Sequence, residues 1–206
     1  MKFVIATGNE GKVREFKRIL EPMGFEVSSL KEMGLSLDVE ETGATFAENA
    51  RIKAKEACRL TGLAAIADDS GLCVDALGGA PGVYSARYSG EGDDGNNQKL
   101  LRELAGVPAE ERTGRYVCAI SCIFPDQTEL TAEGTCEGMI GYALSGNHGF
   151  GYDPLFYVGD RSFGQYGDEE KDAISHRGKA LRAFCEKLKE RQAKTMDERR
   201  KKIDYK

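Results

Sequence analysis

The sequence predicts an α/β fold built around a mixed β-sheet. Segments with apolar residues at helical spacing alternate with short β-branched runs, a pattern typical of strands that pair in parallel through helical crossovers. Two long alternating runs joined by Pro-Asp-Gln predict an antiparallel hairpin in the same sheet. A chain of 206 residues is long enough for one sizeable core or for two lobes that share a cleft, and we expect a single domain.

Each element follows from a local pattern. Thr45 and Glu48 form a capping-box signature that begins a helix extending to about Leu60. The apolar run 63–67 predicts a short buried strand, and the glycine-rich stretch 71–95 predicts irregular backbone. The other expected elements, in chain order, are a strand over 2–7, a helix over 13–20, a strand over 25–30, a helix over 97–105, the hairpin 115–124 and 128–139, a strand over 155–158 and a helix over 178–192.

Composition and net charge indicate a globular protein and argue against a nucleic-acid-binding one. Hydrophobic residues make up 40% of the chain and charged residues 31%, which is ordinary for a globular protein. The segment 189–206 has a net charge of +4. Because the whole chain has a net charge of −5, residues 1–188 together have a net charge of −9. An acidic body argues against a nucleic-acid groove. We therefore expect one domain over 1–188, and we interpret 189–206 as a charged C-terminal helix end or tail rather than an RNA- or lipid-binding segment.

We expect a cytoplasmic protein with no membrane segment. The apolar run 3–6 is too short for a signal peptide, and no stretch approaches membrane-spanning length. The chain has two histidines, His148 and His176, which argues against a His-rich zinc site. The cysteines lie in apolar contexts without CxxC pairs, as expected of reduced core residues: Cys58, Cys73, Cys118, Cys122, Cys136 and Cys185.

A glycine-lysine loop lies between the first predicted strand and helix. Backbone N–H groups and the helix dipole attract anions at such a position, so the loop is a candidate phosphate site. It is not a P-loop, because two residues separate its glycines and Val13 follows the lysine. A turn that needs glycine for steric reasons is the competing interpretation. The loop consists of Thr7, Gly8, Asn9, Glu10, Gly11 and Lys12.

Acidic residues occur in two places that predict a magnesium site. Asp68 and Asp69 follow the buried strand directly, where we expect them to lie at its C-terminal end and at the sheet edge. Glu40 and Glu41 precede the capped helix, where a helix-dipole role competes with a metal-binding one. Mg²⁺ takes carboxylate oxygens and retains waters, so a few acids from separate segments suffice.

The capped helix offers a cation to the same site. Asn49, Lys53 and Glu56 recur at i, i+4 and i+7 and therefore share one helix face. A lysine beside a metal–phosphate site would neutralise triphosphate charge. A solvated lysine is the competing interpretation.

Two further segments contain the parts of a purine pocket. The first is Phe150, Gly151, Tyr152 and Asp153, in which an aromatic ring offers a stacking face and Asp153 an acceptor. The second is 175–178, in which Arg177 offers donors to a keto oxygen. Aromatic residues near glycines are also common in cores and turns, so these segments alone leave the assignment open.

Five ordered motifs together resemble the inosine/xanthosine triphosphate pyrophosphatase family, in particular its bacterial branch. The motifs are TGNEGKVREF, EETGATFAENARIKA, AIADDSGLCVDALGGAPGVYSARYSG, GFGYDPLF and SHRGKAL. The resemblance extends from Lys2 to about Leu188. It implies an elongated mixed sheet with flanking helices, two lobes around a central substrate cleft, a homodimer, and dependence on Mg²⁺ or a similar ion such as Mn²⁺.

The resemblance also implies an activity and a role for each motif. The activity is hydrolysis of dITP, ITP and XTP to the monophosphate and pyrophosphate. Asp69 would be the general base, and Glu41, Asp68 and Asp69 would bind the metal. The Thr7–Lys12 loop and Lys53 would bind the triphosphate, and Ser70 would contact the substrate. The base would be bound by Phe150, Gly151, Tyr152, Asp153, Lys171, His176 and Arg177. Whether Glu40 shares metal binding with Glu41 stays open.

Two other functions compete with this one. A related pyrophosphatase could act on modified pyrimidine nucleotides, and a substrate panel separates the two. A nucleotide-binding sensor would bind without turnover. Asp69 beside Asp68 argues against the sensor, because a pure binder gains nothing from a spare base near the metal.

Overall fold

The computed structural model describes residues 2–204 and the side chains of residues 2–194. Its centre is one seven-stranded sheet with the order β2-β1-β3-β4-β5-β6-β7. In chain order the strands are β1 (Lys2–Ile5), β2 (Glu26–Ser29), β3 (Ala64–Val74), β4 (Thr113–Ile123), β5 (Glu129–Ile140), β6 (Phe156–Val158) and β7 (Arg161–Ser162).

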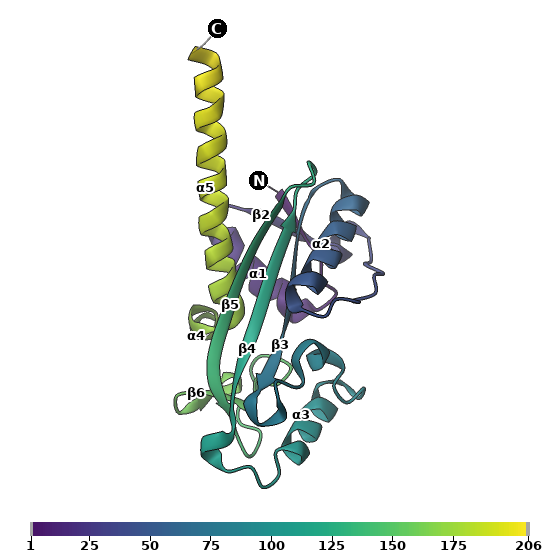
Figure 1. Cartoon of the computed structure of the whole chain (residues 1–206), viewed down its shortest axis with the longest axis vertical. Helices are drawn as coiled ribbons and strands as arrows, with labels where there is room; N and C mark the ends of the chain where they lie inside the picture. The colour runs from purple at the N-terminus through teal and green to yellow at the C-terminus, as the bar shows by residue number, and fades with distance from the viewer. Residues whose placement is uncertain (1, 205–206) are drawn as a thin grey trace.

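The sheet is mixed, as expected. β1 pairs in parallel with both β2 and β3, whereas every pair from β3 to β7 is antiparallel. The predicted hairpin is present as β4 and β5, which pair along their whole length from Thr113↔Met139 to Ile123↔Glu129. These long strands extend from the upper to the lower part of the sheet, with α2 beside their upper part and α3 beside their lower part, and α5 extends beyond them at the top (Figure 1).

Helices cover both faces of the upper part of the sheet. The α-helices are α1 (Glu10–Leu20), α2 (Phe46–Thr61), α3 (Gly92–Glu103), α4 (Asp168–Ile174) and α5 (His176–Asp204). Residues of α1 and α5 pack with one face, in a cluster that contains Phe3, Phe16 and Phe184. Residues of α2 pack with the other, in a cluster that contains Val4 and Ala54. The faces separate because neighbouring strand residues point in opposite directions.

A third cluster forms the core of the lower lobe. It joins the second half of β3 to α3 and to the segment after β5, through Leu72, Leu100 and Phe156 among others. Aromatic rings fill its centre: the Tyr116 and Phe163 rings stack with centroids 5.9 Å apart. The molecule therefore has an upper and a lower lobe that share the long strands β3, β4 and β5.

Three sequence-based boundaries were wrong. The strand expected over 63–67 continues to Val74, so Asp68 and Asp69 lie in the middle of β3 and not at its C-terminal end or at the sheet edge. Acids are tolerated there because cations from neighbouring helices pair with them. The helix expected over 97–105 begins at Gly92, inside the stretch expected to be irregular. The helix expected over 178–192 begins at His176 and continues to Asp204.

Two elements were not predicted. β7 and the start of α4 lie in the stretch 159–170, where the apolar pattern is too short for a prediction, and α4 continues past Lys171 to Ile174. The six cysteines are free thiols, as expected. Among the described residues, no helix is both long and apolar enough to cross a membrane.

Candidate active site

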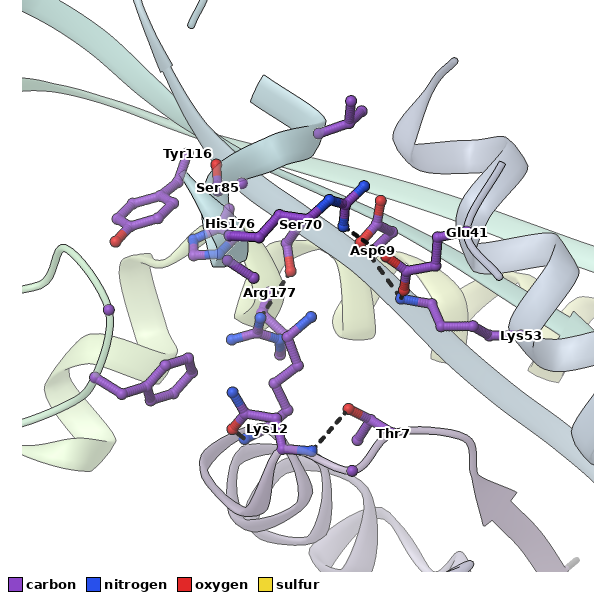
Figure 2. Close-up of a pocket in the computed structure, with 18 of the residues that line it drawn as sticks. Thr7, Lys12, Glu41, Lys53, Asp69, Ser70, Ser85, Tyr116, His176 and Arg177 are labelled. Carbon is purple, nitrogen blue, oxygen red and sulfur yellow. Dashed lines mark hydrogen bonds and ion pairs between the residues drawn. The ribbon is translucent and has the colours of Figure 1, made fainter. Parts of the chain in front are cut away.

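A cavity of about 330 Å³ lies where the two lobes meet. Figure 2 shows Lys53, Glu41 and Asp69 on one side of it and Tyr116 and His176 on the other. Fifteen of the residues predicted from the sequence line it: Thr7, Gly8, Asn9, Lys12, Glu41, Lys53, Asp69, Ser70, Phe150, Gly151, Tyr152, Asp153, Lys171, His176 and Arg177. Glu10, Gly11 and Asp68 do not.

The Thr7–Lys12 loop is the start of α1. Asn9 is its N-cap, and the Asn9 side chain accepts a hydrogen bond from the Lys12 backbone N–H at 3.1 Å. Glu10 points away from the cavity and pairs with Lys31 at 2.6 Å. Gly11 lies directly behind the Phe150 ring, because a Cβ built on it would be 2.7 Å from Phe150 Cδ1.

Asp69 faces α2 and the cavity. The Lys53 ammonium lies 3.3 Å from Asp69 Oδ1 and 2.7 Å from Glu41 Oε1, so it bridges the two carboxylates. Asn49, one turn before Lys53, donates to Asp69 Oδ2 at 3.2 Å. Burial raises the pKa of Asp69 above its ordinary value in spite of the nearby Lys53 charge. Burial would also raise the pKa of Glu41, but the hydrogen bond and charge of Lys53, together with the charges of Lys12 and Arg87, outweigh it and the pKa is lowered.

Asp68 points to the opposite face of β3 and organises cations there. Its Oδ2 lies 3.0 Å from Lys12 Nζ and 3.0 Å from Arg177 Nη2, and it accepts from Ser70 Oγ at 2.5 Å. Its Oδ1 is buried without a hydrogen-bond partner among the described residues. Although burial would raise the pKa of Asp68, Lys12 and Arg177 lower it well below the ordinary range. Asp68 is therefore a fixed anion that holds two cavity cations.

Of the carboxylates expected to bind a metal, Glu41 and Asp69 lie together at the cavity, whereas Asp68 points to the other face of β3. In the part of the chain that the structure describes, no group of three or more His, Cys, Asp or Glu side chains is placed to hold a metal ion. Glu41 and Asp69 nevertheless share one cation, the Lys53 ammonium, which shows that a positive charge fits between them. Glu40 is exposed and does not line the cavity.

Phe150 and Asp153 form the opposite wall. Asp153 is buried, accepts from the Phe150 backbone N–H at 2.8 Å, and pairs with Lys171 at 2.7 Å. Burial raises the pKa of Asp153, although the Lys171 charge acts against it. The Lys171 ammonium also lies 4.8 Å from the centroid of the Phe150 ring. Lys171 therefore joins the ring and the carboxylate.

His176 and Arg177 open α5 at the back of the cavity. The His176 ring stacks on Tyr116, with centroids 4.5 Å apart and an interplanar angle of 9°. Burial lowers the pKa of His176 well below its ordinary value, so the imidazole is neutral, and its Nδ1 is buried without a partner among the described residues. Arg177 makes four hydrogen bonds, to Glu15, Asp68 and Ser70.

Several residues of this site were not predicted from the sequence. Glu15 is buried on α1 and pairs with both Lys171 and Arg177, which lie more than 150 positions away in the chain. Burial would raise its pKa, but these two cations lower it to about 2. A glutamate one turn after Lys12 gives no signal of such partners in the sequence. Tyr116, Arg87 and Asp93 also line the cavity from elements that were not expected to reach it.

The fold and cavity define an α/β protein in which one site combines clustered cations, paired carboxylates and stacked aromatic rings. Residues 3–187 match the model of the Ham1 family, and the chain belongs to that family. The "dITP/XTP pyrophosphatase" of Desulforamulus reducens is 53% identical over 192 residues, which cover 91% of this chain and 96% of the relative. The "dITP/XTP pyrophosphatase" of Bacillus subtilis is 48% identical over 189 residues, which cover 90% of this chain and 96% of the relative.

Solved structures agree with this assignment. The Ham1 protein of Staphylococcus aureus superposes with a TM-score of 0.81 at 40% identity and covers 93% of this chain and 100% of its own. The HAM1 protein of Coxiella burnetii superposes with a TM-score of 0.82 at 39% identity, with 92% and 99% covered. The sequence-based family assignment and the elongated mixed sheet are thereby confirmed.

Proposed function

We propose that this chain hydrolyses deaminated purine nucleoside triphosphates, namely dITP, ITP and XTP, to the monophosphate and pyrophosphate, and so cleanses the nucleotide pool. Its relatives named dITP/XTP pyrophosphatase support this activity. The observation that carries the proposal is that one cavity joins the Lys12, Lys53 and Asp69 cluster to the Phe150 and His176 wall. A triphosphate has a place at one end of such a cavity and a base at the other.

Asp69 would act as the general base. Its raised pKa makes its carboxylate a stronger proton acceptor than an ordinary aspartate, and it lines the cavity. Water would attack the α-phosphorus in line, the bond from that phosphorus to the bridging oxygen would break, and pyrophosphate would leave with the electron pair. The proton of the attacking water would go to Asp69.

The phosphates would be bound by Lys12, Lys53 and the backbone at the start of α1. The two ammonium groups are held by Asp68 and by the Glu41 and Asp69 pair, so they are positioned before the substrate arrives. Preorganised cations stabilise charge that develops on a leaving group. Ser70, which bonds both Asp68 and Arg177, would contact the substrate from β3.

Mg²⁺, with Mn²⁺ as a substitute, would be held by Glu41 and Asp69 together with substrate oxygens and waters. Mg²⁺ commonly uses one or two carboxylates with phosphates in this way. Asp68, with its unpartnered Oδ1, would support the same centre from the other face of β3. When bound, the ion would neutralise phosphate charge.

The base would lie against Phe150 with its edge toward His176 and Arg177, beside Asp153 and Lys171. Hypoxanthine and xanthine carry an acceptor oxygen at the six-position, where adenine carries a donor amine. A guanidinium has five N–H donors, and four of the Arg177 hydrogen bonds go to protein groups, which leaves one donor on Nη1 for that oxygen within the described contacts. A mismatched polar edge can give large discrimination.

The experiment that tests this function measures pyrophosphate release from dITP, XTP, dGTP and dATP side by side, with and without Mg²⁺. We expect dITP and XTP to be strongly preferred. Modified pyrimidine triphosphates in the same panel separate the rival pyrophosphatase, because their preference would replace that for purines. Tight binding of dITP without any turnover would identify a sensor instead.

We also propose a cytoplasmic homodimer, as the family resemblance implies. Sedimentation equilibrium of the purified chain measures the mass in solution directly. A mass of one chain at micromolar concentration would rule out the dimer.

A further inference from the structure

Helix α3 binds the backbone of one residue in the segment 150–153, which we call the base-binding loop after its proposed role. The Gly151 backbone N–H donates to Asp93 Oδ2 at 2.8 Å, and the Gly151 carbonyl accepts from Asn97 Nδ2 at 2.9 Å. Asp93 and Asn97 lie one turn apart at the start of α3, and Asn97 also donates to the Asp93 carbonyl at 2.9 Å. Both polar groups of the Gly151 backbone are therefore bound by α3.

Gly151 is suited to be held in this way. It has a φ of +64°, a left-handed conformation that favours glycine. It lies between Phe150 and Tyr152, so any displacement of its backbone moves the Phe150 ring. Asn97 is buried, whereas Asp93 is at the cavity surface and lines it.

The other end of the loop is anchored independently. Asp153 pairs with Lys171 and accepts from the Phe150 backbone N–H, and these contacts belong to the buried ion pairs of α4 and α5. The loop is thus held at two points: the ion pair with Lys171 holds Asp153, and α3 holds Gly151.

α3 itself is fixed to the lower lobe. The Asn96 amide donates to the carbonyls of Ser85 and Ala86, each at 3.3 Å, and the Tyr152 hydroxyl donates to the Ser85 carbonyl at 2.8 Å. Ser85 in turn donates to the Gly82 carbonyl at 2.6 Å and accepts from the Leu72 backbone N–H on β3. These hydrogen bonds connect the loop, through Ser85, to β3, the strand that contains Asp69.

We propose that Asp93 and Asn97 are positioning residues that set the selectivity for the purine base by fixing Gly151. This inference rests on the proposed function. Discrimination between a keto oxygen and an amine depends on hydrogen-bond geometry, whereas stacking on Phe150 accepts any purine. Loosening Gly151 should consequently weaken the preference for dITP over dATP more than it weakens binding of the phosphates.

The test compares matched variants on the same helix. Asp93→Ala is compared with Asp94→Ala, and Asn97→Ala with Gln98→Ala; Asp94 and Gln98 are exposed neighbours, and neither has a described hydrogen bond to Gly151. Asp93→Asn keeps an acceptor oxygen and serves as the rescue variant. Three quantities are measured: the dITP to dATP ratio of kcat/KM, product inhibition by pyrophosphate, and amide hydrogen exchange of the peptide that contains Gly151. Thermal unfolding confirms that each variant is folded.

We expect Asp93→Ala and Asn97→Ala to lower the ratio about two- to ten-fold relative to their controls, the effect of one lost hydrogen bond. Amide hydrogen exchange at Gly151 should be faster in both variants than in their controls. The inhibition constant of pyrophosphate should stay within about two-fold of the control value. Asp93→Asn should recover most of the dITP to dATP ratio of kcat/KM. Ratios equal to those of the controls would overturn the inference. A wild-type protein without preference for dITP would instead overturn the proposed function, and hydrogen exchange would still decide whether α3 holds the loop.

Discussion

Asp68 and Asp69 are neighbours in one strand and have opposite electrostatic environments. β3 directs Asp68 toward Lys12 and Arg177, whose charges overcome the effect of burial and keep its pKa low. Asp69 points to the cavity, where burial is the larger effect and its pKa is raised. The strand alternation thus places Asp68 among buried cations and Asp69 at the cavity, where we propose that it accepts the proton.

Asp69→Asn should lower kcat by about 10²-fold or more, because the amide keeps the shape and the contact with Lys53 but cannot accept the proton. Steady-state kinetics with dITP measure this, and equilibrium binding of dITP should survive. Asp94→Asn removes an equal charge from an exposed position and should behave as the wild type. Turnover of Asp69→Asn near that of the control would remove Asp69 from the proposed role.

Arg177 should matter for stability as well as for base selectivity. It is buried and pairs with Glu15 and Asp68, which are buried too. Arg177→Ala therefore breaks both buried pairs and leaves each carboxylate with one cation, Lys171 beside Glu15 and Lys12 beside Asp68. We expect a loss of roughly 3–5 kcal/mol in the free energy of unfolding, measured by urea denaturation. Arg161→Ala breaks an exposed pair with Glu170 and should leave the free energy of unfolding nearly unchanged, because solvent screens such pairs. Equal losses in the two variants would contradict the network.

At the scale of elements, the start of α1 joins the two ends of the cavity. The N-cap residue Asn9 lines the cavity at the proposed phosphate end, and Gly11, two residues later, packs against the Phe150 ring at the proposed base end. A glycine is required there because any side chain would occupy the space of the ring. The helix thereby couples the spacing of the two subsites.

Gly11→Ala should displace the Phe150 ring and raise KM for dITP several-fold, roughly the loss expected from weakened base stacking. Gly8→Ala is the matched control, since a Cβ at Gly8 meets nothing within 4 Å. Both variants keep the backbone N–H groups of the loop. A Gly11→Ala protein with the KM of Gly8→Ala would show that the ring does not contact the base.

The elements with regular patterns were predictable from the sequence. The capping box at Thr45 and the β4–β5 hairpin are present, because capping and alternation are local properties. β3 was predicted too short, since the expected strand was ended at two charged residues that the fold pairs with distant lysine and arginine. Local patterns carry no information about such partners.

The candidate site divides in the same way. Motif residues such as Lys12 and Lys53 line the cavity as expected. Glu15 and Asn97 were missed because their roles depend on residues more than 50 positions away, Lys171 and Gly151. Only the three-dimensional arrangement of α1, α3 and α4 brings these contacts together.

On the scale of the whole molecule, two lobes share three long strands and enclose one charged cavity. The upper lobe contributes α1 and α2 to the cavity, and the lower lobe contributes α3 and the loop at Phe150 (Figure 1). If α1 and α2 bind the phosphates, as we propose, a nucleoside triphosphate would contact both lobes at once. Cations and carboxylates meet at the junction, where we propose that a divalent ion binds.

Removal of divalent ions should abolish turnover, because the phosphates would face Glu41 and Asp69 without a neutralising charge. Activity is measured after exhaustive EDTA treatment and again after addition of Mg²⁺ or Mn²⁺, which should restore it. Glu41→Gln should raise the Mg²⁺ concentration needed for half-maximal rate. Full activity in the chelated protein would exclude the acidic centre from the reaction.

We propose that this cavity directs water to the α-phosphorus of a deaminated purine triphosphate. Hydrolysis of dITP in ¹⁸O-water, followed by mass spectrometry of both products, shows which phosphorus the water attacks. We expect dIMP that carries the label and pyrophosphate that does not. Labelled pyrophosphate, or formation of dIDP and orthophosphate, would contradict it.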